Sequence, residues 1–512
     1  MTEISVTPEM TGVYQEEECK SFIPNSLSER TLIIASNRGP ITFHRDETGE
    51  LTYQRGSGGL VTALTGVVRQ AEAHWIACAQ TDEDRAWSDG LIPPDGPGGE
   101  VWMHFIKPTE SQYQGYYGVI ANPLLWFLQH SMWDIFREPT IDRDVWNHWE
   151  EGYVSVNMQF AQAISRQISK APNHPLVMLQ DYHLYLAPYF LRYKFRPSVR
   201  YTMTHFIHIP WPGAEDWGFL PDKIRRAILE GLCAVDLLGV QTREDGRNFL
   251  RTCETYLPGA HISFKRGKVW FRNHATYVHD FPISIDVGGL KRLARSQEVS
   301  DYREQLVEEH GDQKIILRID RIEPSKNIVR GFQAFDEMLE LHPEHRGKVK
   351  FLTLLVPSRL EVEKYSNYLE ELMGASGIVN VKYGDTEWEP IRILVGENYP
   401  RAVAAMQIYN ALLVNSIADG MNLVAKEGPI VNQRNGVLVL SERTGAYQQL
   451  ERGALIVSPL DVFGTAEALH QALTLPEGER YEKSERLRTM IEREDIVDWL
   501  CQQLHLIEKM NL

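Results

Sequence analysis

Short apolar runs recur along this chain between longer amphipathic stretches. They form two sets, at residues 31–38, 175–183, 201–210 and 235–242, and at residues 314–321, 349–357, 411–416 and 436–442. The runs are apolar on both faces, which is typical of strands that helices cover on each side of a sheet. The intervening stretches, such as Pro221–Leu232 and Tyr365–Met373, have helical character. This alternation predicts right-handed βαβ units and parallel sheets.

A chain of 512 residues is too long for one ordinary core. We expect an α/β protein with two doubly wound, Rossmann-like domains that face each other across a cleft and divide near residues 282–289. One large α/β domain with insertions is the alternative. The predicted parts are a loosely held polar arm at 1–30, Rossmann-like domains at 31–286 and 287–485, and a C-terminal helix at 486–512 that packs back on the N-terminal domain.

The net charge of −16 argues against nucleic-acid or anionic-membrane partners, because both need a positive field. Any phosphate site in such a chain must be a local cluster of basic residues on an otherwise acidic protein. The five cysteines are scattered without a CxxC pair, which favours reduced thiols over a disulfide frame or a zinc site. No signal peptide or membrane-spanning run is visible, so we expect a cytoplasmic protein.

Six polar segments follow apolar runs directly. They are residues 36–40, 180–183, 208–212, 320–326, 357–359 and 415–422. Ligands of doubly wound folds bind at the carboxyl ends of the strands, so these segments together indicate a shared binding cleft.

The segment at residues 320–326 carries two cations five residues apart, Arg321 and Lys326. Charge builds on phosphate oxygens when a nucleoside diphosphate leaves a sugar, and these cations could neutralise it without a metal. A solvated surface pair is the equally weighted alternative.

The segment from Asp419 to Glu427 predicts a second contact with such a donor. Gly420 allows close approach of the backbone to a ligand, and a helix start from Asn422 onward suits phosphate oxygens. Asp419 could bind sugar hydroxyls and Glu427 a nucleotide ribose. From this stretch alone, a helix that Asp419 merely caps is the favoured alternative.

Other candidates carry weaker signals. A glycine-rich turn at residues 56–59 could cradle a diphosphate with its amides. Arg38 and Arg359 each follow a strand and together could clamp an acceptor phosphate. His208 ends a strand, although a lone histidine is more often structural. The chain shows no HExxH, G-x-S-x-G or Walker A pattern, which disfavours metalloprotease, hydrolase and NTPase functions. We find no DxD-like pair in a loop that demands a divalent ion, so we expect no catalytic metal.

In this order, the segments resemble the trehalose-6-phosphate synthase family of retaining glycosyltransferases over residues 31–505. The specific matches are Ala35-Ser36-Asn37-Arg38, Gly58-Gly59-Leu60, Tyr116-Tyr117 with Trp126, Asp181-Tyr182-His183, His208-Ile209-Pro210, Arg321 with Lys326, Pro357-Ser358-Arg359, and the stretch from Asp419 to Glu427.

The resemblance implies a GT-B enzyme that needs no cofactor, with its active site between two lobes. Its implied donor site comprises Gly58, Gly59, His208, Arg321, Lys326, Asp419, Gly420, Met421, Asn422, Leu423, Val424 and Glu427, of which Arg321, Lys326, His208 and Asp419 are the implied catalytic residues. Its implied acceptor site comprises Arg38, Tyr117, Trp126, Asp181 and Arg359. Retention without an obvious nucleophile implies a front-face reaction, in which the departing phosphate oxygen accepts the proton of the attacking hydroxyl.

Three positions depart from the family pattern. Ala418 stands where the family often has arginine, Asn327 where it usually has glycine, and Pro324 where an aromatic residue is common. These departures lean towards a pseudo-glycosyltransferase of the validoxylamine 7′-phosphate synthase type. The intact stretch from Asp419 to Glu427 favours glucosyl transfer to glucose 6-phosphate, so the pseudo-sugar reaction, or another acceptor such as glycerol 3-phosphate, is the alternative.

Two other classes fit less well. A non-catalytic sugar-phosphate sensor would be expected to lack Arg321, Lys326, Asp419 or Glu427, and all four are present. A dinucleotide-dependent oxidoreductase should show G-x-G-x-x-G after its first strand, where this chain has ASNRGP. The sequence leaves open UDP-, GDP- or ADP-glucose as donor, and also a homo-oligomer.

Overall fold

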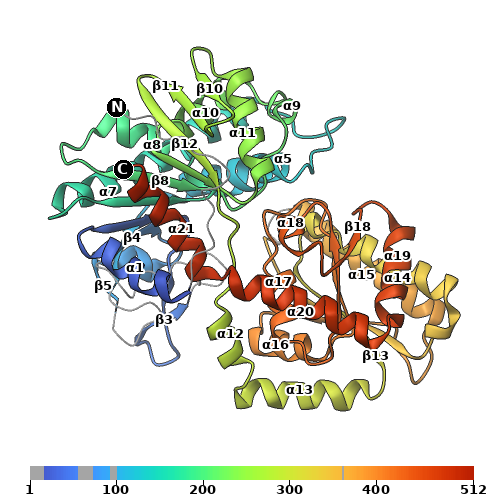
Figure 1. Ribbon diagram of the computed structural model, residues 1–512. Helices are drawn as coiled ribbons and strands as arrows, with labels where there is room; N and C mark the ends of the chain where they lie inside the picture. The colour runs from blue at the N-terminus through green and yellow to red at the C-terminus, as the bar shows by residue number, and fades with distance from the viewer. Residues whose placement is uncertain (1–15, 56–72, 93–100, 360–362, 512) are drawn as a thin grey trace. The chain divides into compact units, whose positions relative to one another are not determined.

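The computed structural model describes residues 16–55, 73–92, 101–359 and 363–511. The chain forms two compact units. Unit 1 comprises Met1–Ile283 together with Ile496–Leu512, and unit 2 comprises Ser284–Asp495. Each unit contains its own mostly or wholly parallel sheet, as the alternating pattern predicted (Figure 1).

The sheet of unit 1 has seven mutually parallel strands, with antiparallel additions at both edges, among the described residues. Across the sheet the order is β10-β11-β12-β9-β8-β7-β1-β4-β6-β5. The strands are β1 (Leu32–Ala35), β4 (Ala73–Cys78), β5 (Gly90–Leu91), β6 (Val101–Ile106), β7 (Leu176–Gln180), β8 (Thr202–Phe206), β9 (Leu237–Val240), β10 (His261–Ser263), β11 (Lys268–Phe271) and β12 (His274–Asp280), and a separate hairpin pairs β2 (Ile41–Arg45) with β3 (Leu51–Arg55). Chain order reverses direction between β1 and β7, which is the switch point where doubly wound folds bind ligands.

Helices of unit 1 connect these strands. They are α1 (Glu16–Ser28), α3 (Asp82–Ala86), α4 (Glu110–Tyr113), η2 (Gln114–Trp126), α5 (Phe127–Gln129), α6 (Arg143–Asn147), η3 (His148–Val154), α7 (Ser155–Lys170), η4 (Tyr182–Leu184), α8 (Ala187–Tyr189), η5 (Phe190–Phe195), α9 (Ala214–Trp217), α10 (Asp222–Leu232), α11 (Arg243–Tyr256) and α21 (Ile496–Lys509). α7 shows why such a helix forms here. Its apolar side chains Val156, Phe160 and Ile164 recur at helical spacing and are fully buried.

The sheet of unit 2 is wholly parallel and has the order β15-β14-β13-β16-β17-β18. Its strands are β13 (Lys314–Arg321), β14 (Val349–Val356), β15 (Ile391–Val395), β16 (Ala411–Val414), β17 (Val437–Ser441) and β18 (Leu455–Val457). Chain order reverses between β13 and β16, so the carboxyl ends of these two strands flank the switch point of unit 2.

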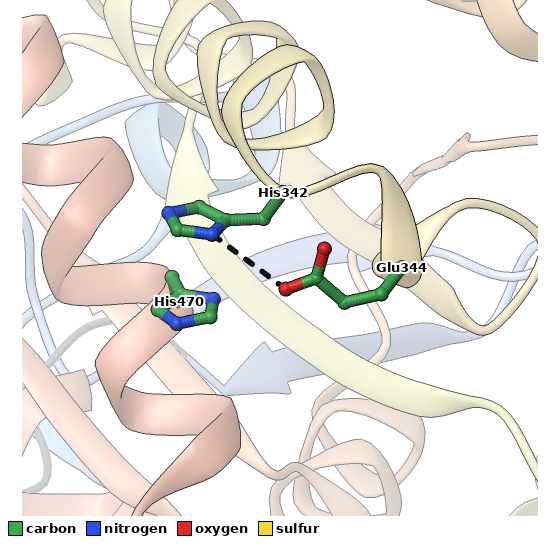
Figure 2. Close-up of side chains that lie close together, drawn as sticks. All are labelled: His342, Glu344 and His470. Carbon is green, nitrogen blue, oxygen red and sulfur yellow. Dashed lines mark ion pairs between the residues drawn. The ribbon is translucent and has the colours of Figure 1, made fainter.

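The helices of unit 2 cover both faces of this sheet, because the connections before and after the switch point cross it on opposite sides. They are α12 (Val287–Leu293), α13 (Gln297–His310), η6 (Pro324–Lys326), α14 (Ile328–Leu341), η7 (Pro343–His345), α15 (Glu363–Tyr383), α16 (Tyr399–Ile408), α17 (Val424–Val431), α18 (Tyr447–Leu450), α19 (Val462–Thr474) and α20 (Glu477–Arg493). α14 packs against α19, and His342, next after α14, stacks on His470 of α19 with ring centroids 3.5 Å apart (Figure 2).

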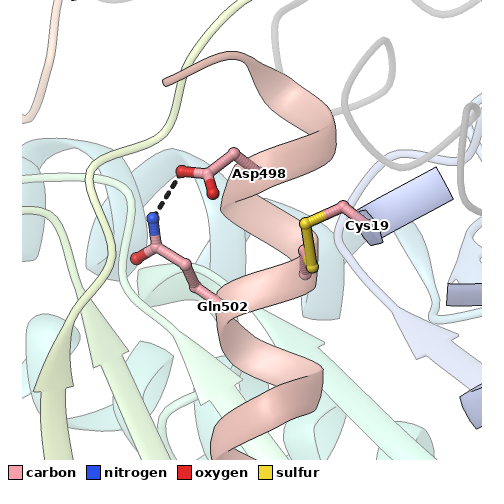
Figure 3. Close-up of a disulfide and its surroundings, with 4 residues drawn as sticks. Cys19, Asp498 and Gln502 are labelled. Atoms are coloured by element: carbon pink, nitrogen blue, oxygen red, sulfur yellow. Dashed lines mark hydrogen bonds between the residues drawn. A yellow bond between two sulfur atoms is a disulfide. The ribbon is translucent and has the colours of Figure 1, made fainter. Parts of the chain in front are cut away.

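Distant parts of the chain meet in unit 1 through a disulfide. Cys19 of α1 and Cys501 of α21 are bonded, with their Cα atoms 5.6 Å apart (Figure 3). Nearby, Phe22 of α1 stacks on His505 of α21 with ring centroids 3.6 Å apart. The expectation of reduced thiols is therefore wrong for this pair, whereas Cys78, Cys233 and Cys253 are free and buried. Part of the predicted loose arm is a helix fixed to unit 1.

All eight predicted apolar runs contain a strand, namely β1, β7, β8, β9, β13, β14, β16 and β17. The two stretches expected to be helical coincide with α10 and with the N-terminal half of α15. Among the described residues, no helix has the length and hydropathy that a membrane span requires.

Candidate active site

Three polar loops leave neighbouring strands at the carboxyl edge of unit 2. Arg321 is the last residue of β13, Arg359 follows β14, and Asp419 follows β16. β13 pairs with β14 on one side and with β16 on the other. Sheet pairing therefore brings together side chains that lie up to 98 positions apart in the chain.

Lys326 and Asp419 form a largely buried ion pair at the switch point. The Nζ atom of Lys326 lies 2.5 Å from Oδ2 of Asp419, and the two side chains are 10% and 12% exposed. The same carboxylate oxygen accepts hydrogen bonds from Ser416 Oγ at 3.2 Å and from Asn422 Nδ2 at 3.1 Å. Lys326 is therefore no solvated surface cation, which removes that alternative for this residue.

Arg321 and Arg359 share one buried carboxylate. Oε1 of Glu323 lies 3.2 Å from Nη1 of Arg321 and 3.9 Å from Nη1 of Arg359, and it accepts a hydrogen bond from Ser358 Oγ at 3.0 Å. Glu323 has no exposed side-chain surface, whereas the Arg321 side chain is 46% exposed. Arg359 also donates to the hydroxyl of Tyr365 at 2.8 Å. Arg321 and Arg359 therefore lie in one cluster, although the sequence assigned Arg321 to the donor and Arg359 to the acceptor.

A second layer of charge lies beneath these loops. Arg318, in the middle of β13, is fully buried, and its Nε lies 3.0 Å from Oδ2 of Asp320. Its guanidinium also donates to Oδ1 of Asn415 at 2.6 Å and to the carbonyl of Lys326. Burial raises the pKa of Asp320 to about 6. Arg318 therefore ties the Lys326 loop to the end of β16.

No sequence motif marks this layer. Arg318, Asp320 and Glu323 have no motif of their own, although four charged residues within the apolar run KIILRIDR are unusual for a strand buried on both faces. This excess of charged residues was the signal in the sequence that could have indicated the buried charges.

The turn from Asp419 to Leu423 is fixed by a close approach of backbone. A Cβ atom added at Gly445 would lie 1.7 Å from the carbonyl oxygen of Gly420, so only glycine fits there. The backbone N–H of Gly445 donates to the carbonyl of Asp419 at 2.9 Å, and that of Ala446 donates to Met421 at 3.1 Å.

The helix after this turn is capped by a residue other than Asp419. α17 begins at Val424, after Leu423, and Oδ1 of Asn422 accepts from the backbone N–H of Ala425 at 3.2 Å. Asn422 itself has a positive φ of 72°. The alternative that Asp419 merely caps the helix is therefore wrong.

Glu427 lies in the first turn of α17, where its Oε1 accepts a hydrogen bond from the Tyr399 hydroxyl at 2.8 Å. Burial raises the pKa of Glu427. A carboxylate next to a helix N-terminus is favourably placed for the helix dipole, and its acceptor oxygens suit ribose hydroxyls.

Asn327 explains one departure from the family pattern. It adopts a left-handed conformation with φ 59° and ψ 38°, which glycine adopts without strain and asparagine tolerates. Its Nδ2 donates to the carbonyls of Asn415 at 3.0 Å and of Pro459 at 2.7 Å. Asparagine therefore preserves the turn after Lys326 and adds two hydrogen bonds.

The carboxyl edge of unit 1 holds a second group of predicted residues. Arg38, which is exposed, follows β1, and Asp181 follows β7 on the other side of the switch point. Asp181 has a positive φ of 71°, and its Oδ1 accepts from the backbone N–H of His208 at 3.3 Å.

His208 is a neutral imidazole in this structure. Burial, together with neighbouring His205, lowers its pKa to about 3. Its Nε2 lies 2.9 Å from Oε1 of Gln180, so we assign the proton to Nε2 and a donor role to that nitrogen.

Tyr117 and Trp126 reach the same edge through aromatic contacts. Tyr117 stacks on His183 with ring centroids 5.8 Å apart, and Trp126 contacts Tyr182 at 5.4 Å. Trp126 is 5% exposed. Because Tyr182 and His183 directly follow Asp181, these side chains belong to one cluster. The predicted Gly58 and Gly59 lie outside the described residues.

Comparison with known proteins places this architecture among sugar-transferring enzymes. The chain is 32% identical over 473 residues to an α,α-trehalose-phosphate synthase (UDP-forming) A of Dictyostelium discoideum, covering 91% of this chain but 61% of that protein. It is 31% identical over 474 residues to an α,α-trehalose-phosphate synthase (UDP-forming) of Schizosaccharomyces pombe, covering 91% and 88%. A solved α,α-trehalose-phosphate synthase (UDP-forming) from Burkholderia xenovorans, in complex with glucose-6-phosphate, is similar at 27% identity and a TM-score of 0.79, covering 94% of this chain and all of that one.

Two doubly wound units, each with polar side chains at the carboxyl edge of its switch point, define a glycosyltransferase of the GT-B fold. The chain belongs to glycosyltransferase family 20, whose family model matches residues 30–509.

Proposed function

We propose that this glycosyltransferase moves glucose from UDP-glucose to glucose 6-phosphate with retention of configuration, forming trehalose 6-phosphate and UDP. The observation that carries the proposal is the buried Lys326–Asp419 pair beside Arg321, at the switch point of unit 2. The two curated relatives described above are both named UDP-forming trehalose-phosphate synthases, which favours uridine over guanosine or adenosine in the donor.

The demanding step is cleavage of the bond between the anomeric carbon of glucose and the phosphate oxygen. The electron pair of this bond stays on the diphosphate, so negative charge grows there. Lys326 and Arg321 supply cations for this charge, and Asp419 holds hydroxyls of the glucose with the backbone of residues 420–424. Preorganised charge of this kind is often the largest single contribution to catalysis.

The attacking hydroxyl of glucose 6-phosphate forms the new bond on the face that the diphosphate leaves. Its proton passes to the departing phosphate oxygen, which balances the step without a protein base. His208 is neutral at physiological pH, so in this proposal it donates a hydrogen bond to the donor and transfers no proton. Glu427 binds the ribose.

The proposed acceptor residues are those that the family resemblance implies. Arg38, Tyr117 and Trp126 bind the acceptor phosphate, and Asp181 binds acceptor hydroxyls near it. Arg359 is assigned to the same phosphate, and its link to Arg321 through Glu323 would couple acceptor binding to the donor cluster. No cofactor takes part in this scheme. A cytoplasmic location and a homo-oligomer stay predictions.

A matrix of donors and acceptors tests the proposal. UDP-, GDP- and ADP-glucose are each combined with glucose 6-phosphate, glycerol 3-phosphate and validamine 7-phosphate. Released nucleoside diphosphate is measured enzymatically, and the product is analysed by NMR. We expect the highest kcat/KM for UDP-glucose with glucose 6-phosphate and an α,α-linked product.

Other results would identify a different reaction. Preference for validamine 7-phosphate would replace the proposal with a reaction of the pseudo-glycosyltransferase type, and preference for glycerol 3-phosphate would change the acceptor. A β-linked product would exclude the front-face reaction. Tight donor binding with no turnover of any pair would favour a sensor.

A further inference from the structure

Unit 2 carries a group of histidines and glutamates that is not part of the candidate active site. His342 directly follows α14, Glu344 and His345 lie in η7, and His470 lies on α19 (Figure 2). η7 ends four residues before β14 begins, so the group lies at the amino ends of the strands. The candidate donor residues of unit 2 follow the carboxyl ends of β13 and β16, at the opposite edge of the sheet.

The spacing of the side chains suits a metal ion. One nitrogen of His342, one nitrogen of His470 and one carboxylate oxygen of Glu344 all lie within 4.8 Å of one another. Nδ1 of His342 lies 3.6 Å from Oε1 of Glu344. Ligand atoms at zinc distances of about 2.0–2.2 Å in a tetrahedron are roughly 3.4 Å apart, so binding needs only small side-chain movements.

Two further residues hold these ligands in place. Oε1 of Glu467, one turn before His470 on α19, lies 2.8 Å from Nε2 of His342. This contact leaves Nδ1 of His342 facing Glu344. Nε2 of His345 lies 3.0 Å from Nδ1 of His470. A carboxylate or other partner on the second nitrogen of a ligating histidine is the usual support of a zinc site.

We propose that His342, Glu344 and His470 bind a zinc ion, with Glu467 and His345 as positioning residues. Imidazole ligands suit zinc and its neighbours among the transition metals, whereas magnesium and calcium prefer sites made of oxygen ligands. The two glutamates also offset the charge of a divalent cation. The Glu344 and Glu467 side chains are 58% and 45% exposed, so the ion enters from solvent.

The ion links α19 to the segment that follows α14. Because the ligands lie at the amino edge of the sheet, its expected effect is on the stability of unit 2 and not on glucosyl transfer. Binding to the folded state alone raises the melting temperature as free zinc increases.

Metal binding by the full chain, without a histidine tag and after treatment with a chelator, tests the site. Zinc chloride is titrated by calorimetry, and bound metal is counted by mass spectrometry after desalting. We expect one zinc ion per chain, a rise of several degrees in the melting temperature of unit 2, and a visible spectrum of a tetrahedral ion when cobalt replaces zinc.

Variants locate the ion. His342→Gln, Glu344→Gln and His470→Gln should each abolish stoichiometric binding, and Glu467→Gln should weaken it about 10–100-fold. His261→Gln, at an exposed histidine of unit 1, is the control and should bind zinc normally. The proposal would be overturned if the unmodified chain bound no zinc. It would also be overturned if Glu344→Gln, which changes an exposed side chain, bound zinc as well as the control does.

Discussion

Replacing Lys326 with methionine separates the structural role of its ion pair from its proposed catalytic role. The ammonium group lies 2.5 Å from the Asp419 carboxylate, and both side chains are about nine-tenths buried. Removing one partner of a buried pair leaves an uncompensated charge and costs about 3–5 kcal/mol. Because Ser416 and Asn422 also donate to Asp419, we expect the lower end, about 3 kcal/mol for Lys326→Met.

The double variant Lys326→Met/Asp419→Asn removes both charges. A neutral amide needs no cation, so most of the lost stability should return. Turnover should not return, because the cation that stabilises the leaving diphosphate is still missing. We expect kcat to stay at least about 10²-fold below that of the unmodified enzyme, which is typical for loss of one charge-stabilising donor.

Stability is measured by urea unfolding, monitored on the transition of unit 2, and kcat by UDP release. Lys382→Met is the matched control, because Lys382 pairs with Asp336 and Glu340 at the surface of the same unit. Exposed pairs contribute about 0–1 kcal/mol, so this variant should be nearly as stable and as active as the parent. Recovery of both stability and turnover in the double variant would show that Lys326 serves only the fold.

Three further predictions address other residues. Arg359→Ala should raise the KM for glucose 6-phosphate at least about tenfold with little change in UDP binding, and an equal loss of UDP affinity would move Arg359 to the donor. Reducing the Cys19–Cys501 disulfide, or making Cys19→Ser, should destabilise unit 1 by about 2–5 kcal/mol, which thermal unfolding with and without reductant measures; an unchanged transition would mean that the bond does not restrain the unfolded chain. Burial lowers the folded pKa of His208 to about 3, so its contribution to stability is present above pH 6.5 and is lost as pH falls towards 3. At pH 5 this loss is about 2 kcal/mol, and it should be missing from the urea-unfolding profile of His208→Gln, whereas parallel profiles would show that His208 does not titrate in this range.

The sequence predicted the sheets because burial on both faces leaves a clear apolar signal in each central strand. It missed strands with mixed composition, such as β12, where His274, Tyr277, His279 and Asp280 interrupt the apolar pattern. It also missed the Cys19–Cys501 bond. That pairing depends on α1 and α21 packing together across 482 residues of chain, and no local spacing encodes it.

The candidate site was predictable as a set of residues but not as a network. Strand-end positions indicated that the loops after β13 and β16 lie at one edge of the sheet, and Lys326 and Asp419 of these loops form an ion pair. The connecting carboxylate Glu323 could not be inferred in the same way. Its importance comes from complete burial between two arginines, which depends on how β13 and β14 align.

An acidic chain binds two phosphorylated substrates in this proposal, and the paired cations explain how. Arg321 lies against Glu323 and Lys326 against Asp419, so each of these cations is paired with a carboxylate. A guanidinium has five N–H donors, and Arg321 can therefore keep Glu323 while donating to a phosphate with the exposed part of its side chain. Lys326 has three donors on one nitrogen and can bridge Asp419 and the diphosphate in the same way. The carboxylates thus orient the cations, and the remaining donors supply positive charge where the leaving group needs it.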